Sequence, residues 1–84
     1  MSMNSSVLPA VLNIMAQLFS LPPGSLTAES SMETVEQWDS LQHINVIVDI
    51  EQHFNITMSP EEVMQLHSVQ AIVDMVESRL AGTH

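Results

Sequence analysis

The stretch WDSLQHINVIVDIEQHF, residues 38–54, decides the fold of this chain. Its apolar residues return every three or four positions, which is the spacing of one side of an α-helix. Asp39 or Ser40 can cap the N-terminus of this helix, which we predict to run from about Ser40 to His53. Backbone N–H groups are unpaired at a helix N-terminus, and the helix dipole is positive there. A serine at this point therefore lies where a phosphate ester is stabilised.

An earlier helix is predicted by apolar residues between Val7 and Phe19, which also recur at helical spacing. Ser5 or Ser6 could cap it, and the run LPPG at residues 21–24 should stop it. Residues 20–38 then form a long loop, a kind of segment that is often functional. The residues expected to hold this loop on the core are Leu26, Met32 and Val35.

Two more helices are predicted after residue 54. The run SPEE at residues 59–62 has a capping serine, proline at the first helical position and glutamate at the third. A short helix should begin there and end near Leu66 or His67. Ser68 could cap a fourth helix, which Gly82 would close. The apolar stripe of this fourth helix comprises Val69, Ile72, Val73, Val76 and Leu80.

The whole chain, residues 1–84, is predicted to be one all-α domain. A chain of 84 residues of which 45% are hydrophobic can bury one modest core. We expect a small four-helix bundle with a short third helix and a long loop between the first two helices. Residues 1–4 and 82–84 should be disordered ends.

The charge of the chain limits its partners. The chain has ten acidic residues and a single basic residue, Arg79, so its net charge is −9. No basic patch exists that could neutralise phosphates, and binding to nucleic acid or to an anionic membrane is therefore not expected. A protein this acidic should meet basic surfaces on partner proteins.

The absence of cysteine excludes disulfides, thiolate metal sites and a cysteine nucleophile. The first apolar stretch has no basic residues before it and is interrupted by Pro9, Asn13 and Gln17, so it is neither a signal peptide nor a membrane span. We expect a cytoplasmic monomer.

The predicted helix at residues 40–53 has apolar residues on two sides. Its core side is formed by Val46, Ile47, Ile50 and Phe54. Leu41 and Val48 fall roughly opposite, and Ile44 lies on the flank. Two apolar residues on the solvent side, close to Ser40, suggest a docking patch. They could equally be scattered surface residues or contacts with the long loop, and periodicity does not separate these alternatives.

Eight of the ten carboxylates lie between Glu29 and Glu62. Those expected around the helix at residues 40–53 are Glu36, Asp39, Asp49 and Glu51. One interpretation is a solvated acidic face that confers solubility. The other is electrostatic steering toward a basic partner.

Ser40 could simply be an N-cap, because Asp-Ser pairs before helices are common. It is a poor candidate for an enzyme nucleophile. His43 is near, but no Gly-x-Ser-x-Gly elbow or glycine-rich oxyanion loop accompanies it. His43 could orient the loop, touch a phosphate or pack, and we favour a structural role. Asp39 and His43 have the spacing of metal ligands, but two ligands do not make a site. We therefore predict neither catalytic residues nor a metal.

Three of the seven methionines, Met15, Met64 and Met75, are interpreted first as core filler. Their second interpretation is an adaptable lining for an apolar pocket between helices.

With these residues assembled, the chain resembles the phosphopantetheine-attachment region of acyl carrier proteins. The similarity covers nearly the whole chain, and its order of helices agrees with that family. The matching runs are WDSLQHI at residues 38–44, IE at 50–51, Phe54, SPEE at 59–62 and SVQAIV at 68–73.

The resemblance implies that a phosphopantetheinyl transferase attaches 4′-phosphopantetheine to Ser40 from coenzyme A, with Mg²⁺. The new thiol would carry acyl groups as thioesters, so the chain would be a carrier and not an enzyme. Asp39 and Leu41 flank the attachment site, and Asp39 matches the acidic residue that aids recognition by the transferase. Residues matching docking positions for acyl-loading and condensing enzymes with basic surfaces are Leu41, Ile44, Val48, Asp49 and Glu51.

The chain also departs from the pattern of many fatty-acid-synthesis carriers. Gln37 and Trp38 stand where those have glycine close before Asp-Ser-Leu, and Gln42, His43 and Asn45 are uncharged. This is more similar to discrete carriers of polyketide or mixed polyketide–peptide pathways. A peptidyl or aminoacyl carrier is only the second possibility, because this chain lacks the Gly-Gly-x-Ser motif that such carriers usually have. An unmodified helical interaction module is the third.

Overall fold

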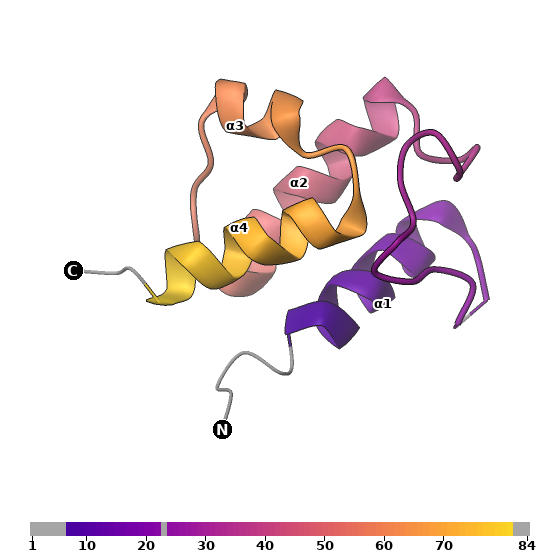
Figure 1. Ribbon diagram of the computed structural model, residues 1–84, viewed down its shortest axis with the longest axis horizontal. Helices are drawn as coiled ribbons and strands as arrows, with labels where there is room; N and C mark the ends of the chain where they lie inside the picture. The colour runs from indigo at the N-terminus through magenta and orange to yellow at the C-terminus, as the bar shows by residue number, and fades with distance from the viewer. Residues whose placement is uncertain (1–6, 23, 82–84) are drawn as a thin grey trace.

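Four α-helices, in the predicted order, make up the regular structure of the described residues in a computed structural model of this chain (Figure 1). The structure describes residues 7–22 and 24–81. Within those residues it contains no strand beyond an isolated bridge between Ser31 and Ser68, so the all-α prediction is confirmed. The helices are α1 (Val7–Phe19), α2 (Ser40–Phe54), α3 (Pro60–Gln65) and α4 (Val69–Ala81).

Some expectations concern residues outside the described ranges. These are the capping of α1 by Ser5 or Ser6, the closing of α4 by Gly82, and the disordered ends at 1–4 and 82–84.

Both ends of α2 are closed by their neighbours. Asp39 is the N-cap, and its side chain accepts a hydrogen bond of 2.9 Å from the Gln42 N–H. Asn55 ends the helix in the left-handed conformation, with φ 57° and ψ 49°, and its N–H donates to the Glu51 carbonyl. Asparagine tolerates this conformation better than most residues do. The helix that carries the candidate serine is therefore fixed at both ends.

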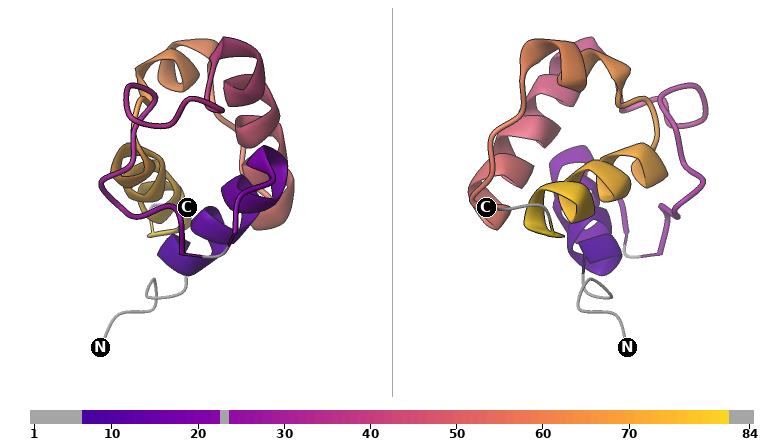
Figure 2. Two further views of the ribbon diagram at one scale, coloured as in Figure 1. Left: turned by 90° about the vertical axis from the view of Figure 1, so that its right-hand side faces the viewer. Right: turned by 60° about the vertical axis from the view of Figure 1, so that its left-hand side comes forward.

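The three longer helices enclose the core. α1 packs against both α2 and α4 (Figures 1 and 2). The largest fully buried side chains are Val7, Val11, Met15, Trp38, Val46, Ile50, Val69, Ile72 and Val76. On α2, the predicted core side is confirmed, with Phe54 half-buried at its end. Leu80 differs from expectation and is 37% exposed, because it lies in the last turn of α4, beyond the buried stretch that ends at Val76.

The loop of residues 20–38 is held on the core by its apolar side chains, as predicted. Leu26 is buried, and Met32 and Val35 are half-buried against the core. Trp38, which closes the loop, is only 1% exposed and is among the largest fully buried side chains. The loop crosses one end of the bundle beside the connection between α3 and α4 (Figure 2).

The same loop completes the N-terminus of α4. The N–H groups of Val69 and Gln70 donate to the carbonyls of Ser30 and Ala28, at 2.9 and 3.1 Å. Ser68 caps the helix, since its hydroxyl accepts from the Ala71 N–H at 3.1 Å. The N–H groups at the start of α4 that lack intrahelical acceptors are thus paired with other parts of the fold.

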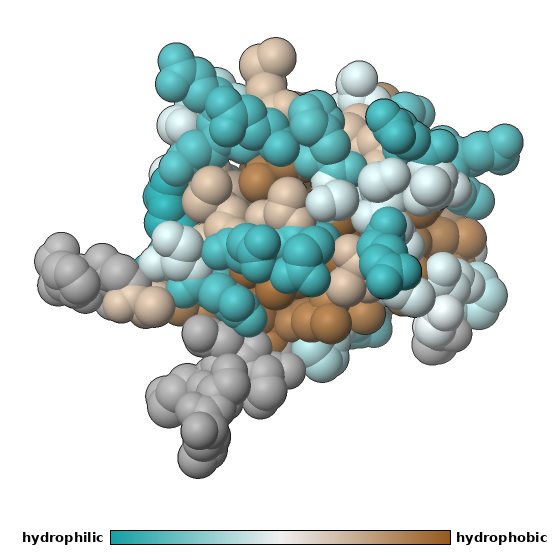
Figure 3. Space-filling view, viewed as in Figure 1, coloured by the Kyte–Doolittle hydropathy of each residue, from teal (hydrophilic) through white to brown (hydrophobic). Residues whose placement is uncertain are grey.

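α3 is the helix that the core holds least. None of its six residues, all of them described, is buried. It begins with the predicted capping box, in which the Ser59 hydroxyl accepts from the Glu62 N–H and the Glu62 carboxylate accepts from the Ser59 N–H. Hydrophilic side chains cover much of the surface over α3 and α4 in Figure 3, with apolar side chains visible between them. No helix among the described residues is long and apolar enough to cross a bilayer.

Candidate functional site

Ser40 differs from the other serines at helix starts because its hydroxyl is free. It is the first residue of α2, is exposed, and makes no side-chain hydrogen bond within the described part of the chain. The hydroxyls of Ser59 and Ser68 each accept a bond from a backbone N–H of their own helix. Ser40 is thus the helix-start serine whose oxygen is available for a covalent bond.

The backbone around Ser40 also suits an anion. The cap uses the side chain of Asp39 for the Gln42 N–H and the Asp39 carbonyl for the His43 N–H, at 2.8 Å. The N–H groups of Ser40 and Leu41 precede the first intrahelical acceptor. Within the described residues no loop carbonyl accepts from them, whereas carbonyls at residues 28 and 30 accept from the start of α4. A phosphate ester on Ser40 would meet these N–H groups at the positive end of the α2 dipole. The residues present therefore fit a phosphorylated prosthetic group.

His43 is buried and both of its ring nitrogens are bonded. Trp38 Nε1–H donates to His43 Nδ1 at 3.0 Å, and His43 Nε2 lies 2.8 Å from the carbonyl oxygen of Val63 in α3. The ring is 7% exposed. These contacts give His43 the structural role that was expected. The partnership with Trp38 was not predicted, although a lone tryptophan directly before the motif is a signal for burial.

Asp39 and His43 are not arranged as metal ligands. Asp39 is exposed and caps α2, whereas His43 points into the core with no nitrogen to spare. Among the residues that the structure describes, no three histidine or carboxylate side chains gather as a possible metal site.

The apolar residues expected to dock partners are all exposed. Leu41 is 74% exposed, Ile44 53% and Val48 41%. Met64 on α3 is 72% exposed, so its interpretation as core filler is wrong, while Met15 is buried and Met75 half-buried in the core. Val63 is the side chain of this short helix that packs against the core, and the next residue, Met64, therefore faces away from the core.

A groove of about 320 Å³ lies between α2 and α3. Its lining consists of Ile44, Ile47, Val48, Glu51, Met58, Pro60, Val63 and Met64. Met64 thus takes the place foreseen for methionine in a pocket between helices. The groove joins the exposed apolar residues of α2 to those of α3.

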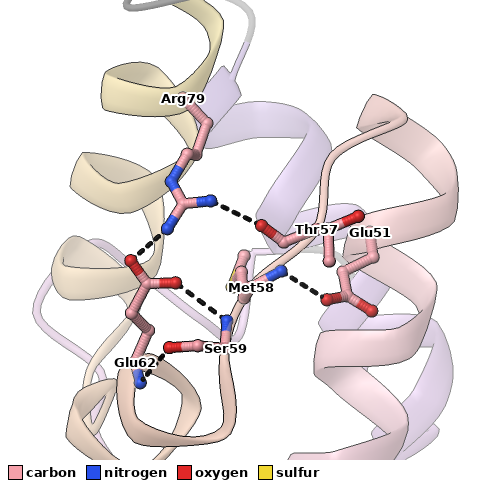
Figure 4. A network of polar contacts seen from close by, with 6 residues as sticks. All are labelled: Glu51, Thr57, Met58, Ser59, Glu62 and Arg79. Carbon is pink, nitrogen blue, oxygen red and sulfur yellow. Dashed lines mark hydrogen bonds and ion pairs between the residues drawn. The ribbon is translucent and has the colours of Figure 1, made fainter.

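The two acidic docking candidates differ in their surroundings. Asp49 is half-buried and makes no hydrogen bond or ion pair among the described residues. Glu51 is also half-buried, but its Oε2 accepts a bond of 2.7 Å from the Met58 N–H (Figure 4). Glu51 therefore fastens the α2–α3 link, besides any contact with a partner.

Glu62 is the carboxylate whose titration the fold alters. The Ser59 N–H, and then the Arg79 guanidinium, hold the pKa of Glu62 below its ordinary value by stabilising the charged form (Figure 4).

Comparison with known proteins gives the class of this chain. The family model described as the phosphopantetheine attachment site matches residues 9–76, which is most of the chain. The class to which this chain belongs is therefore that of phosphopantetheine-binding proteins.

The relatives narrow the class. The acyl carrier protein of Thermosynechococcus vestitus is 29% identical over 78 residues, which cover 93% of this chain and 96% of the relative. That of Buchnera aphidicola subsp. Baizongia pistaciae is 36% identical over 64 residues, covering 76% and 82%. The solution NMR structure of holo acyl carrier protein from Geobacter metallireducens superposes with a TM-score of 0.80 and 34% identity, covering 94% of this chain and 95% of that chain.

This chain belongs to the acyl carrier protein family, which confirms the resemblance seen in its sequence. It is a carrier protein and not an enzyme, and its cofactor is covalently bound 4′-phosphopantetheine.

Proposed function

We propose that Ser40 is the residue that carries 4′-phosphopantetheine, and that the chain presents acyl groups on it as thioesters. The observation that carries this proposal is the free, exposed Ser40 hydroxyl beside two N–H groups without intrahelical acceptors. The capping bonds of Ser59 and Ser68 argue against those serines.

The chain supplies the hydroxyl, and a phosphopantetheinyl transferase supplies the rest of the chemistry. The Ser40 oxygen would displace adenosine 3′,5′-bisphosphate from coenzyme A and lose its proton to a base of the transferase. Within this chain, His43 is no candidate for that base, because both of its nitrogens are bonded in the core. Asp39 uses one carboxylate oxygen for the cap. Its negative charge would be recognised by the transferase.

Three exposed and two half-buried residues of α2 form the proposed docking surface for acyl-loading and condensing enzymes. Leu41, Ile44 and Val48 give it apolar contact, and Asp49 and Glu51 give it negative charge for basic partner surfaces. The groove between α2 and α3 is the proposed place for the apolar part of an acyl chain.

We propose a specialised, polyketide-type pathway for this carrier. Support comes from the first turn of α2, which contains no acidic residue, and from the uncharged Gln42, His43 and Asn45. The chain would act as a monomer in the cytoplasm.

Intact mass tests the attachment site. Coenzyme A, Mg²⁺ and a broad-specificity transferase should add one phosphopantetheine to the native chain and none to Ser40→Ala. Ser59→Ala and Ser68→Ala are matched controls, since each is a helix-start serine, and both should accept the group. Modification of Ser40→Ala would move the site elsewhere, and no modification of the native chain would favour an unmodified interaction module.

Loading assays on the holo chain test the cargo. Malonyl or other acyl transfer by polyketide-type loading enzymes should acylate the thiol, as read by mass. Loading by adenylating enzymes with an amino acid, and not with acyl groups, would replace the proposal by an aminoacyl carrier.

A further inference from the structure

We propose that His43 is a positioning residue that couples α3 to the segment Trp38–Asp39–Ser40, so that a displacement of α3 is felt at the attachment site. The importance of this coupling rests on the proposed role of Ser40. The bonds themselves do not depend on that role.

The pairing of the His43 ring determines its protonation. The indole Nε1–H of Trp38 can only donate, so His43 Nδ1 must accept at 3.0 Å. The Val63 carbonyl can only accept, so His43 Nε2 must carry the proton and donate at 2.8 Å. The ring is thus neutral, with the proton on Nε2. Since it is buried, neither nitrogen has water to replace a lost partner.

One end of this chain of bonds is firmly held. Trp38 is 1% exposed, packs against Phe19 of α1 with ring centroids 6.3 Å apart, and lies two residues before Ser40. Its ring also lies against that of His43, with centroids 5.8 Å apart. A change at His43 Nδ1 therefore acts directly on the residue that leads into the N-cap of α2.

The other end is weakly held. Val63 is in α3, which has no buried residue, and its carbonyl accepts both from His43 and from the Leu66 N–H at 3.2 Å. His43 thus supplies a side-chain cap to the last turn of α3 from the neighbouring helix α2. Val63 and Met64 also line the groove between α2 and α3.

These two ends explain the coupling. A group that enters the groove, or a partner that presses on Met64, acts on α3, whose carbonyl is tied to His43. An imidazole is rigid and bonded at both nitrogens, so a displaced Val63 carbonyl must either lose its bond or draw the ring away from Trp38. The start of α2 therefore responds to the position of α3.

Two substitutions of His43 separate the two bonds. The Oδ1 of asparagine matches the position of Nδ1, so His43→Asn keeps the acceptor for Trp38 and loses the bond to Val63. The amide nitrogen of glutamine matches Nε2, so His43→Gln keeps the donor for Val63 and loses the acceptor for Trp38.

The reporter is the hydrogen-exchange rate of the Trp38 indole N–H, measured by NMR on the unmodified chain. The sequence contains a single tryptophan, so the signal is unambiguous. Glu62→Ala is the perturbation of α3, because it removes the carboxylate half of the capping box and the contact with Arg79. Glu61→Ala is its matched control, with the same change of charge and of helix propensity, since Glu61 has no such contacts among the described residues.

With His43 present, Glu62→Ala should raise the indole exchange rate roughly two- to tenfold, as expected for a weakened hydrogen bond, whereas Glu61→Ala should not. In the His43→Asn background, Glu62→Ala should leave the rate unchanged. A residue with a merely structural role would not make one response depend on the other. An indole rate that Glu62→Ala does not change, or changes equally in both backgrounds, overturns the coupling.

The rate of phosphopantetheine transfer links the coupling to function. His43→Gln, which frees Trp38, should lower kcat/KM for the transferase more than His43→Asn does, and equal values would contradict the proposed direction. The mass of Ser40→Ala tests the attachment site separately. If the mass showed that phosphopantetheine is attached elsewhere, the indole exchange could still respond to Glu62→Ala. Failure of the proposed attachment at Ser40 is therefore distinguishable from failure of the coupling through His43.

Discussion

Arg79, near the end of α4, binds the carboxylate of Glu62 in the first turn of α3 (Figure 4). The same guanidinium donates to the carbonyl of Thr57 at 2.6 Å, in the link between α2 and α3. Glu62 uses its other oxygen for the Ser59 N–H at 2.9 Å. The only arginine of a chain without lysine thus ties α4 to the link and to the start of α3. α3 is held from this side by Arg79 and from the α2 side by His43.

Arg79→Gln should lower the free energy of unfolding only modestly, because this ion pair is partly exposed to water. Arg79→Lys keeps the charge but cannot form the fork to two acceptors, so it should recover part of the loss only. Urea unfolding followed by circular dichroism measures both. Full recovery by lysine would show that charge alone matters at this position.

Acid should weaken the contribution of Glu62. Its pKa is lower in the folded chain, because the Ser59 N–H and then Arg79 stabilise the carboxylate. The stabilisation is present in full above the unfolded-state pKa of about 4.3, and is lost as pH falls through the lower folded-state pKa. The difference in unfolding midpoint between the native chain and Glu62→Gln should therefore shrink from about pH 6 to pH 3. A difference that grows in acid would reverse the sign assigned here.

Asp39 combines a structural and a proposed recognition role, which two substitutions should separate. Asp39→Asn keeps an oxygen for the Gln42 N–H, so the stability should change little, whereas Asp39→Ala should cost about 0.5–2 kcal/mol. Both remove the charge offered to the transferase, so both should raise its KM. If Asp39→Asn were modified as well as the native chain, Asp39 would be a cap only.

The fold was predictable because each helix is marked locally. The runs at residues 39–42 and 59–62 contain their own caps, and the apolar spacing of α1 and α2 extends over enough turns to define a buried side. The position of Ser40 at the start of α2 was predictable for the same reason, since it follows the cap at Asp39.

The unpredicted features depend on contacts between distant segments. Met64 lies on a six-residue helix, which is too short for periodicity to define a buried side. The bond of His43 to Val63 and that of Glu51 to Met58 join separate elements, so no local pattern announces them. Asn55 as the left-handed end of α2 could have been inferred, because asparagine after an apolar helical run is a known stop signal.

Ile50→Ala should affect stability, whereas Val48→Ala should affect transfer to a partner enzyme. Ile50 is fully buried, so its truncation leaves a cavity and should cost about 2–5 kcal/mol. Val48 is 41% exposed, so its truncation should stay within about 0.5 kcal/mol but slow transfer to a partner enzyme. Urea midpoints and acyl-transfer rates measure the pair. Equal losses of stability would contradict the assignment of the two faces.

Salt should act on this chain in two opposing ways. The net charge of −9 makes the carboxylates repel one another, and ions screen that repulsion, so the melting temperature should rise with NaCl. The same ions weaken the pair of Arg79 with Glu62. In Arg79→Gln, where the net charge changes from −9 to −10, the pair is absent and repulsion is greater, so salt should stabilise this variant more than the native chain.

The difference in melting temperature between the native chain and Arg79→Gln should therefore narrow as NaCl rises. A constant difference would show that the ion pair contributes through geometry alone.

Association with a basic partner should respond in the opposite sense, because attraction between unlike surfaces is screened by the same ions. Stopped-flow rates should fall between about 0.05 and 0.5 M NaCl, a range over which the screening length shortens from above to below 10 Å. If salt raised the melting temperature but left these rates unchanged, the carboxylates near Ser40 would affect folding only. Asp49 and Glu51 would then lose their proposed part in docking.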